Sequence, residues 1–246
     1  MLISVINRTH GALSDAEIQR VLRAVNRQVG YDFQPHWHRA AELRLEGGTG
    51  GYRENAMPSD MRGEGILYLM SRVSVRDALG YHDRNYRGIP CGFVFTELAK
   101  KLDEPWSATF SHEVLELIGD PEVNLLVRGP HPTDRRRQVF HWHEMCDAVQ
   151  DEHYLIDGVT VSNFVLPLYF TSTDERGGRN DFLGTKHHGK SLSSFGVNPG
   201  GYIGYFDPRN GEHSTYAIAG DTRAATRKAI KLKAKRARRA VRYQAK

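Results

Sequence analysis

The sequence has little cysteine and no long hydrophobic run. Only Cys91 and Cys146 occur among the 246 residues, which excludes a disulfide scaffold and a zinc site built mainly from thiolates. No stretch approaches the roughly 18 consecutive apolar residues of a membrane-spanning helix. Residues 1–8 lack the apolar run and the small-residue cleavage site of a signal peptide. We therefore expect a soluble, cytoplasmic protein that is not exported and has no membrane partner.

Acidic residues are nearly absent from the C-terminal end. Residues 221–246 hold eleven of the 34 Lys and Arg residues but only one of the 29 acids, so their net charge is +10 against −5 for residues 1–220. This segment is rich in Ala, Lys and Arg, which favours a helix. We expect a globular domain over 1–220 and a basic helical tail over 221–246 that contacts nucleic acid or an acidic partner. The alternative is a solubilising tail that binds nothing specific.

The rest of the sequence is typical of a mixed α+β domain, with 39% hydrophobic and 26% charged residues. Ser14 and Glu17 form a capping box before a helix whose apolar residues follow helical spacing as far as Val29. A hairpin is expected over 154–161 with Asp157-Gly158 at its turn, and 171–201 reads as a long loop. The pattern predicts strands over residues 2–6, 31–33, 41–45, 66–70, 92–95, 138–147 and 164–170, with a turn-rich segment over 71–90.

Residues 106–120 predict an amphipathic helix with an acidic face. From His112, an advance of about 100° per residue puts Glu116 at about 40°, Asp120 at about 80° and Glu113 at about 100°. The apolar residues fall on the opposite side. Three neighbouring carboxylates repel one another unless a cation or a basic partner offsets them, and this face carries no Lys or Arg. We therefore predict a metal or catalytic site here; the alternative is a polar face that touches only water.

The segment Ser111-His112-Glu113-Val114-Leu115-Glu116 resembles the active-site helix of zincin metallopeptidases, His-Glu-x-x-His, with Glu116 in place of the second histidine. The expected order of strand, helix, strand and strand before this helix is similar to metzincin-type zincins. The resemblance implies a zincin-like α+β fold with a mixed sheet. It also implies that His112 and Glu116 bind a metal ion and that Glu113 is the general base.

A second resemblance, to uncharacterised bacterial and phage-encoded proteins, would span most of residues 1–220. It rests on His-Glu-x-x-Glu before Asp-Pro at 112–121, on Glu-x-Cys-Asp at 144–147 and on Ser-Asn-Phe at 162–164. This second resemblance does not imply a particular activity. If this chain is phage-encoded, the expected location becomes the virion.

The sequence leaves the third metal ligand open. Asp120 lies one turn beyond Glu116 on the same helix face, and four further candidates follow downstream. These are His141, His143, Glu144 and Asp147. In an extended strand Glu144 would share the less polar side with Trp142 and Cys146, where a buried acid needs a partner, so Glu144 is the favoured downstream ligand. Zinc is the first expectation, although a carboxylate at Glu116 shifts the site toward calcium or magnesium.

The resulting hypothesis is a metal-dependent hydrolase that cleaves a peptide or other acyl bond. The alternative is a zincin-derived protein that has lost catalysis and serves as a binding or structural component, for example of a phage particle, with the basic tail contacting nucleic acid or a partner. A third hypothesis is nucleotide binding by residues 184–191, which match the phosphate-loop pattern Gly-x4-Gly-Lys-Ser. Their flanks lack the strand and the helix that such a loop needs.

Overall fold

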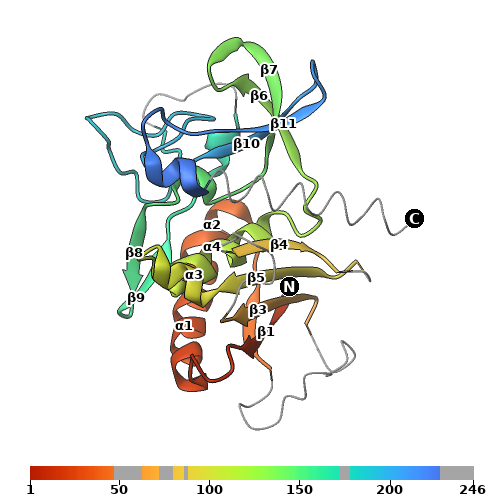
Figure 1. The fold of residues 1–246 in the computed structure, drawn as a ribbon, viewed down its shortest axis with the longest axis vertical. Helices are drawn as coiled ribbons and strands as arrows, with labels where there is room; N and C mark the ends of the chain where they lie inside the picture. The colour runs from red at the N-terminus through yellow and green to blue at the C-terminus, as the bar shows by residue number, and fades with distance from the viewer. Residues whose placement is uncertain (47–62, 72–79, 86–87, 172–177, 228–246) are drawn as a thin grey trace. The chain divides into compact units, whose positions relative to one another are not determined.

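The computed structural model describes residues 1–46, 63–71, 80–85, 88–171 and 178–227, which form a mixed α+β structure as predicted. The chain divides into two compact units (Figure 1). The first contains the described residues of Met1–Ser74, Leu79–Val123 and His153–Ser162, and the second contains those of Asn124–Glu152 and Asn163–Lys246. None of the described helices is long and apolar enough to cross a membrane.

A five-stranded mixed sheet forms the centre of the first unit, in the order β2-β1-β3-β5-β4. Its strands are β1 (Leu2–Arg8), β2 (Glu42–Leu45), β3 (Gly65–Met70), β4 (Gly80–Arg84) and β5 (Pro90–Phe95). The first four in that order pair in parallel, and β4 pairs with β5 antiparallel. Strands were predicted close to β1, β2, β3 and β5. β4 was missed because it lies in the segment that the sequence marked as turn-rich.

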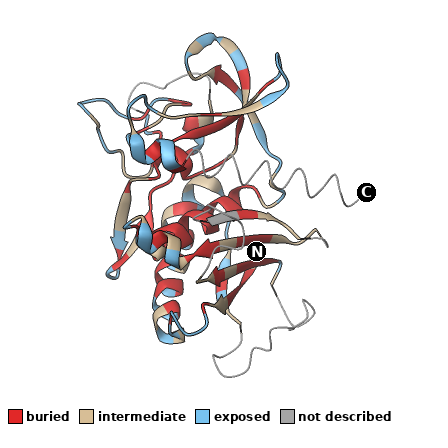
Figure 2. Ribbon diagram, viewed as in Figure 1, coloured by how far each residue is buried: buried red, intermediate tan, exposed pale blue. Residues whose placement is uncertain are grey.

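The first helix begins as the capping box predicts. The Ser14 side chain accepts a hydrogen bond from the Glu17 amide and caps α1 (Asp15–Arg27). The chain then continues through a π-helix, Gln28–Phe33, into α2 (Gln34–Trp37). The predicted strand over 31–33 is therefore wrong: Val29 and Phe33 are fully buried and extend the apolar stripe of α1 at helical spacing. Figure 2 shows α1 buried along one side and exposed along the other.

Helix α4 (Trp106–Gly119) follows the short α3 (Thr96–Lys101) and contacts β4, β5 and β9. The predicted hairpin consists of β8 (His153–Ile156) and β9 (Val159–Ser162), and Asp157 and Gly158 have the positive φ angles of a tight turn. Ser107 Oγ donates to Thr160 O at 2.8 Å, and Ser111 Oγ accepts from Ser162 N at 2.7 Å. Two serines of α4, one turn apart, thus fasten the helix to this hairpin.

The second unit contains an antiparallel sheet in the order β11-β10-β7-β6. Its strands are β6 (Leu126–His131), β7 (Asp134–Trp142), β10 (Ile203–Asp207) and β11 (Glu212–Tyr216). The strand predicted over 138–147 ends at Trp142, and the one predicted over 164–170 is wrong, because Pro167–Phe170 form a 3-10 turn. Residues 178–201 contain neither helix nor strand, which agrees with the predicted long loop. A Cβ on Gly204 would lie 1.8 Å from the Trp142 ring, so β10 requires glycine there.

The start of the predicted tail belongs to the second unit. Residues 222–227 are helical, and Asp221 accepts hydrogen bonds from the amides of Ala224 and Gly200, which lower the pKa of its carboxyl group. Arg227 is buried and pairs with Asp151 at 2.8 Å. Residues 228–246 lie outside the described residues, so the boundary at 220/221 and the helical character of the tail stay predictions.

Candidate metal site

The polar residues of α4 lie in its buried middle rather than on a solvated face. His112 and Glu113 are each 5% exposed and Glu116 is fully buried. The alternative that these side chains touch only water is therefore wrong. Burial of carboxylates is costly unless a hydrogen-bond donor, a basic group or a metal ion offsets their charge.

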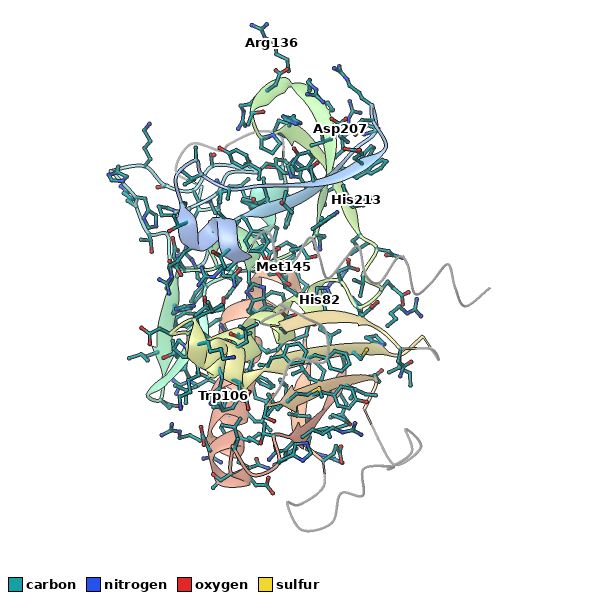
Figure 3. The ribbon with its side chains drawn as sticks, viewed as in Figure 1. His82, Trp106, Arg136, Met145, Asp207 and His213 are labelled. Carbon is teal, nitrogen blue, oxygen red and sulfur yellow. The ribbon has the colours of Figure 1, made fainter. Side chains whose placement is uncertain are left out.

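Strand β4 supplies a histidine that completes a group on the first unit. Nδ1 of His82 lies 3.6 Å from Oε2 of Glu113 and 3.6 Å from Oε2 of Glu116. On the helix itself, Nε2 of His112 lies 3.1 Å from Oε1 of Glu116. All four side chains are buried, and they come from an edge strand and from the helix that contacts it. Figure 3 marks His82 on this strand.

Each histidine lies at a ligand-like distance from one oxygen of Glu116, His82 from Oε2 and His112 from Oε1. Zinc is bound at about 2.0 to 2.2 Å from nitrogen and oxygen in a tetrahedral arrangement, so two ligand atoms of one ion are about 3.4 Å apart. The separations of 3.1 and 3.6 Å fall on either side of this value. Buried histidine and carboxylate side chains at these spacings are the kind of ligands that a divalent cation takes.

A second explanation of the same geometry needs no metal. A protonated His82 would neutralise part of the charge of Glu113 and Glu116, which both face it. However, both separations from His82 exceed the usual N–H···O hydrogen-bond length of about 2.7 to 3.2 Å. Ion ligands do not need to approach one another as closely as hydrogen-bonded groups do.

The two residues proposed as third ligand are placed differently. Asp120 is buried as the C-cap of α4, and among the described residues it belongs to no group of three or more potential metal ligands within 4.8 Å of one another. Glu144 belongs to the second unit and stays a predicted ligand. Sequence reasoning missed His82 because its strand was not recognised, and a single histidine in a turn-rich segment carries no spacing signal.

The end of α4 is fixed by a residue far from it in the sequence. Arg39 Nη1 donates to the carbonyl oxygens of Gly119 at 2.7 Å and Ile118 at 3.3 Å. These carbonyls have no partner within the helix, and a guanidinium group also interacts favourably with the negative end of the helix dipole. Arg39 and the serine contacts to β9 thus hold both ends of the helix that carries the site.

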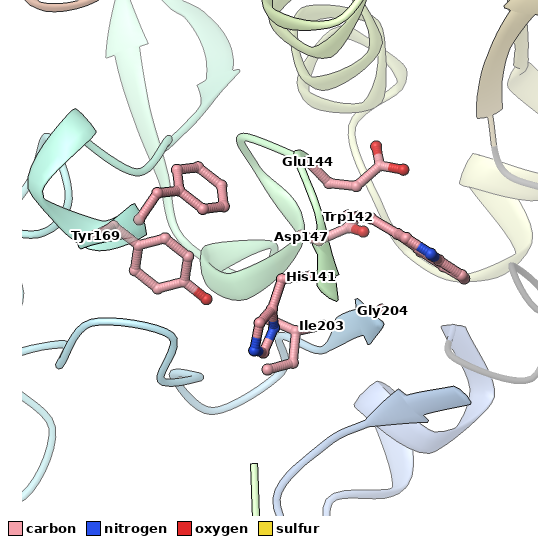
Figure 4. Close-up of a pocket in the computed structure, with 8 residues that line it drawn as sticks. His141, Trp142, Glu144, Asp147, Tyr169, Ile203 and Gly204 are labelled. Atoms are coloured by element: carbon pink, nitrogen blue, oxygen red, sulfur yellow. The ribbon is translucent and has the colours of Figure 1, made fainter. Parts of the chain in front are cut away.

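The second unit has a pocket of its own (Figure 4). Its lining residues are His141, Trp142, Glu144, Asp147, Tyr169, Phe170, Ile203 and Gly204. The alternation expected for an extended strand over 138–147 does not apply beyond Trp142, where β7 ends. The chain leaves the extended conformation after Trp142 and makes a 3-10 turn at Asp147–Val149, and Glu144 and Asp147 both line the pocket together with His141 and Trp142.

His141 is held as a neutral imidazole in this pocket. Its Nε2 lies 2.8 Å from the carbonyl oxygen of Pro130, to which it donates, and its ring packs against Phe195. Burial lowers the pKa of His141 from 6.5 to about 4, although the hydrogen bond to Pro130 opposes this shift. Burial, together with the charge of Asp147, raises the pKa of Tyr169, whose hydroxyl donates to Gly196 O.

A buried carboxylate anchors the long loop. Glu152 accepts hydrogen bonds from His187 Nε2 at 2.7 Å, Asn198 Nδ2 at 2.6 Å and Asn163 Nδ2 at 2.6 Å. His187 and Lys190 also close a tight turn through reciprocal backbone hydrogen bonds. Residues 184–191 therefore form an anchored turn without a following helix, and the phosphate-loop hypothesis is wrong.

The site thus rests on residues far apart in the sequence that a sheet and a helix bring together. His112, Glu113 and Glu116 were predicted, and His82 is added by the fold. Comparison with known proteins adds no further assignment: the chain matches no protein-family model and no curated protein.

Proposed function

We propose that the protein is a zincin-like metalloprotein that hydrolyses a peptide or other acyl bond. The observation that carries the proposal is the burial of Glu116 between two histidines, with His82 Nδ1 3.6 Å from its Oε2 and His112 Nε2 3.1 Å from its Oε1. The chain opens with β1, α1, β2 and β3 in the order that the resemblance to zincins implies, but α2 lies between α1 and β2, and β4, β5 and α3 also precede α4.

His82 takes the position that the sequence predicted for Asp120 or Glu144. Two imidazoles and one carboxylate would then hold the ion, a donor set found in catalytic zinc sites and in non-haem iron sites with open positions. The sequence predicted one nitrogen ligand, from His112, and two oxygen ligands. With His82 in the third position the site would have two nitrogen ligands and one oxygen ligand. Zinc is therefore favoured over calcium and magnesium, which prefer oxygen ligands.

Glu113 is the proposed general base. Its position about 100° around the helix from His112 puts its carboxylate beside the ligands rather than among them. From there it can accept a proton from an attacking water and return it to the leaving group. A divalent cation, when bound, supplies the Lewis acidity that polarises the acyl carbonyl.

The alternative, a protein without catalysis, is favoured by one observation. His82 faces both Glu113 and Glu116, so a histidinium ion could compensate the buried carboxylates without any metal. The protein would then retain a zincin-like framework as a binding or structural component. Metal analysis separates the two proposals.

We expect purified protein to carry close to one equivalent of zinc, with an anomalous scattering peak beside His82, His112 and Glu116. His82→Ala, His112→Ala and Glu116→Ala should each lower the metal content and the melting temperature, because ion binding stabilises the folded state by mass action. His153→Ala, a partly exposed histidine of the same unit, is the matched control and should keep the metal. No stoichiometric metal, with a melting temperature unaffected by chelation, would contradict the metal site.

Glu113→Gln then separates an enzyme from an inactive relative. It should keep the metal and the fold but lose hydrolysis of peptide, ester or amide probes by about a hundredfold, the usual contribution of a positioned acid or base. Metal-loaded wild-type protein without turnover, or turnover unchanged in Glu113→Gln, would leave only the binding or structural role.

A further inference from the structure

Thr109 places a hydroxyl group on the same face of α4 as the metal group. It is 7% exposed, and within the described part of the chain its Oγ1 makes no hydrogen bond. A helical threonine commonly bonds back to the carbonyl four residues earlier. Here that carbonyl, of Pro105, accepts instead from the amides of Ala108 and Thr109. The Thr109 hydroxyl is thus buried and has no hydrogen-bond partner among the described residues.

Glu113 presents a second oxygen of this kind one turn further along. It is 5% exposed, and its Oε2 makes no hydrogen bond to any described residue, since His82 Nδ1 lies 3.6 Å away. Residues four apart lie about 40° from each other around a helix, with Cβ atoms about 5 to 6 Å apart. Thr109 and Glu113 can therefore contact one small molecule between them.

Buried polar atoms in folded proteins are nearly always hydrogen-bonded, by protein, by ordered water or by a ligand. A carboxylate only accepts hydrogen bonds, whereas a hydroxyl both donates and accepts. A water molecule satisfies the pair, because it donates to Glu113 Oε2 and accepts from Thr109 Oγ1. An anion such as phosphate would instead be repelled by the negative charges of two carboxylates, Glu113 and Glu116.

We infer that Thr109 is a positioning residue, which together with Glu113 holds the water that attacks the acyl carbon. The inference rests on the proposed hydrolase function. The water oxygen forms a bond to the acyl carbon while one of its protons passes to Glu113, and the carbonyl electron pair moves onto the carbonyl oxygen. Collapse of this intermediate breaks the bond to the leaving group, which receives the proton from Glu113. The Thr109 hydroxyl donates a hydrogen bond to one lone pair of the water oxygen. This orients the water so that its other lone pair points at the acyl carbon.

Two substitutions at Thr109 test this role. Thr109→Val keeps the shape and removes the hydroxyl, and it should lower kcat for p-nitrophenyl acetate about tenfold, the worth of one hydrogen bond of about 1.4 kcal/mol. KM and metal content should not change. Thr109→Ser restores a hydroxyl and should keep kcat within about twofold of wild type. Thr215→Val is the matched control, because Thr215 in β11 is another buried hydroxyl without a described hydrogen bond.

A readout independent of activity is a high-resolution crystal structure of the zinc-loaded protein. It should show a water within hydrogen-bonding distance of both Thr109 Oγ1 and Glu113 Oε2, and this water should be absent from Thr109→Val. An active wild type in which Thr109→Val keeps its kcat, or a structure without this water, overturns the inference and leaves the hydrolase proposal standing. A wild type that binds no metal or shows no turnover overturns the hydrolase proposal itself, and with it the role of Thr109.

Discussion

At the scale of single residues, burial decides which groups carry charge. His141 is 2% exposed and its pKa is lowered to about 4, so it is neutral at pH 7 and holds its Nε2 proton against Pro130 O. In an unfolded chain a histidine titrates near its ordinary value of about 6.5. Between these values the unfolded state binds more protons than the folded state does.

We therefore expect His141 to make the protein less stable as the pH falls from about 6.5 to about 4. The contribution of His141 to the free energy of unfolding is fully present above pH 6.5. Below that pH it decreases by up to about 1.4 kcal/mol per pH unit, in total by about 3 kcal/mol. Urea unfolding of the wild type and of His141→Gln at several pH values measures it. Glutamine keeps a donor for Pro130 O but does not titrate, so its stability should fall less steeply. Equal slopes in both proteins would contradict this prediction.

At the scale of structural elements, the buried carboxylates of Glu116 and Glu152 have different structural surroundings. Glu116 lies on a regular helix whose ends are fixed by Arg39 and by serine contacts to β9. Glu152 instead gathers donors from His187, Asn198 and Asn163, and so holds a segment without helix or strand against the second unit. The ordered state of residues 178–201 thus depends on side-chain hydrogen bonds.

Glu152→Gln should therefore loosen this loop. The amide replaces one accepting oxygen by a donor that faces other donors, so we expect a loss of about 3 kcal/mol in the free energy of unfolding. Trypsin should also cleave faster after Lys186 or Lys190, which mass spectrometry of the fragments would identify. Glu212→Gln, an exposed acid of β11, is the control and should change neither measurement. Unchanged cleavage in Glu152→Gln would show that backbone contacts suffice.

At the scale of the whole molecule, charge is divided between the body and the C-terminal tail. Removing residues 228–246 takes away nine Lys and Arg residues and no acid, so the net charge falls from +5 to −4. The cut after Arg227 keeps the buried Arg227–Asp151 pair and the Asp221 cap. It therefore spares the part of the predicted tail that packs in the second unit.

We expect the truncated protein to fold and to bind duplex DNA or an acidic partner more weakly than the full chain does. If the tail acts by neutralising phosphates, the affinity of the full chain should fall steeply with salt and the truncation should lose this dependence. A salt titration of both proteins, with a chain whose nine tail cations are replaced by glutamine as control, measures this effect. Equal binding by full-length and truncated protein would show that residues 228–246 do not contribute to this binding.

The sequence alone determined the elements whose signals are local. The Ser14 cap with its helical stripe, the Asp157-Gly158 turn and the strands of the first sheet other than β4 follow from turn chemistry and periodicity. Local spacing likewise put His112, Glu113 and Glu116 on one side of α4. These features depend on contacts between residues close in the chain, which composition and spacing record directly.

Tertiary structure decided what covers that side of the helix. Periodicity distinguishes a polar face from an apolar one, but it does not tell whether the polar face meets water or other side chains. The antiparallel pairing of β4 with β5 brings His82, 30 residues before His112, to Glu113 and Glu116. Sheet pairing over such a separation leaves no periodic trace in the sequence, so the histidine that completes the candidate metal group became visible only in the fold.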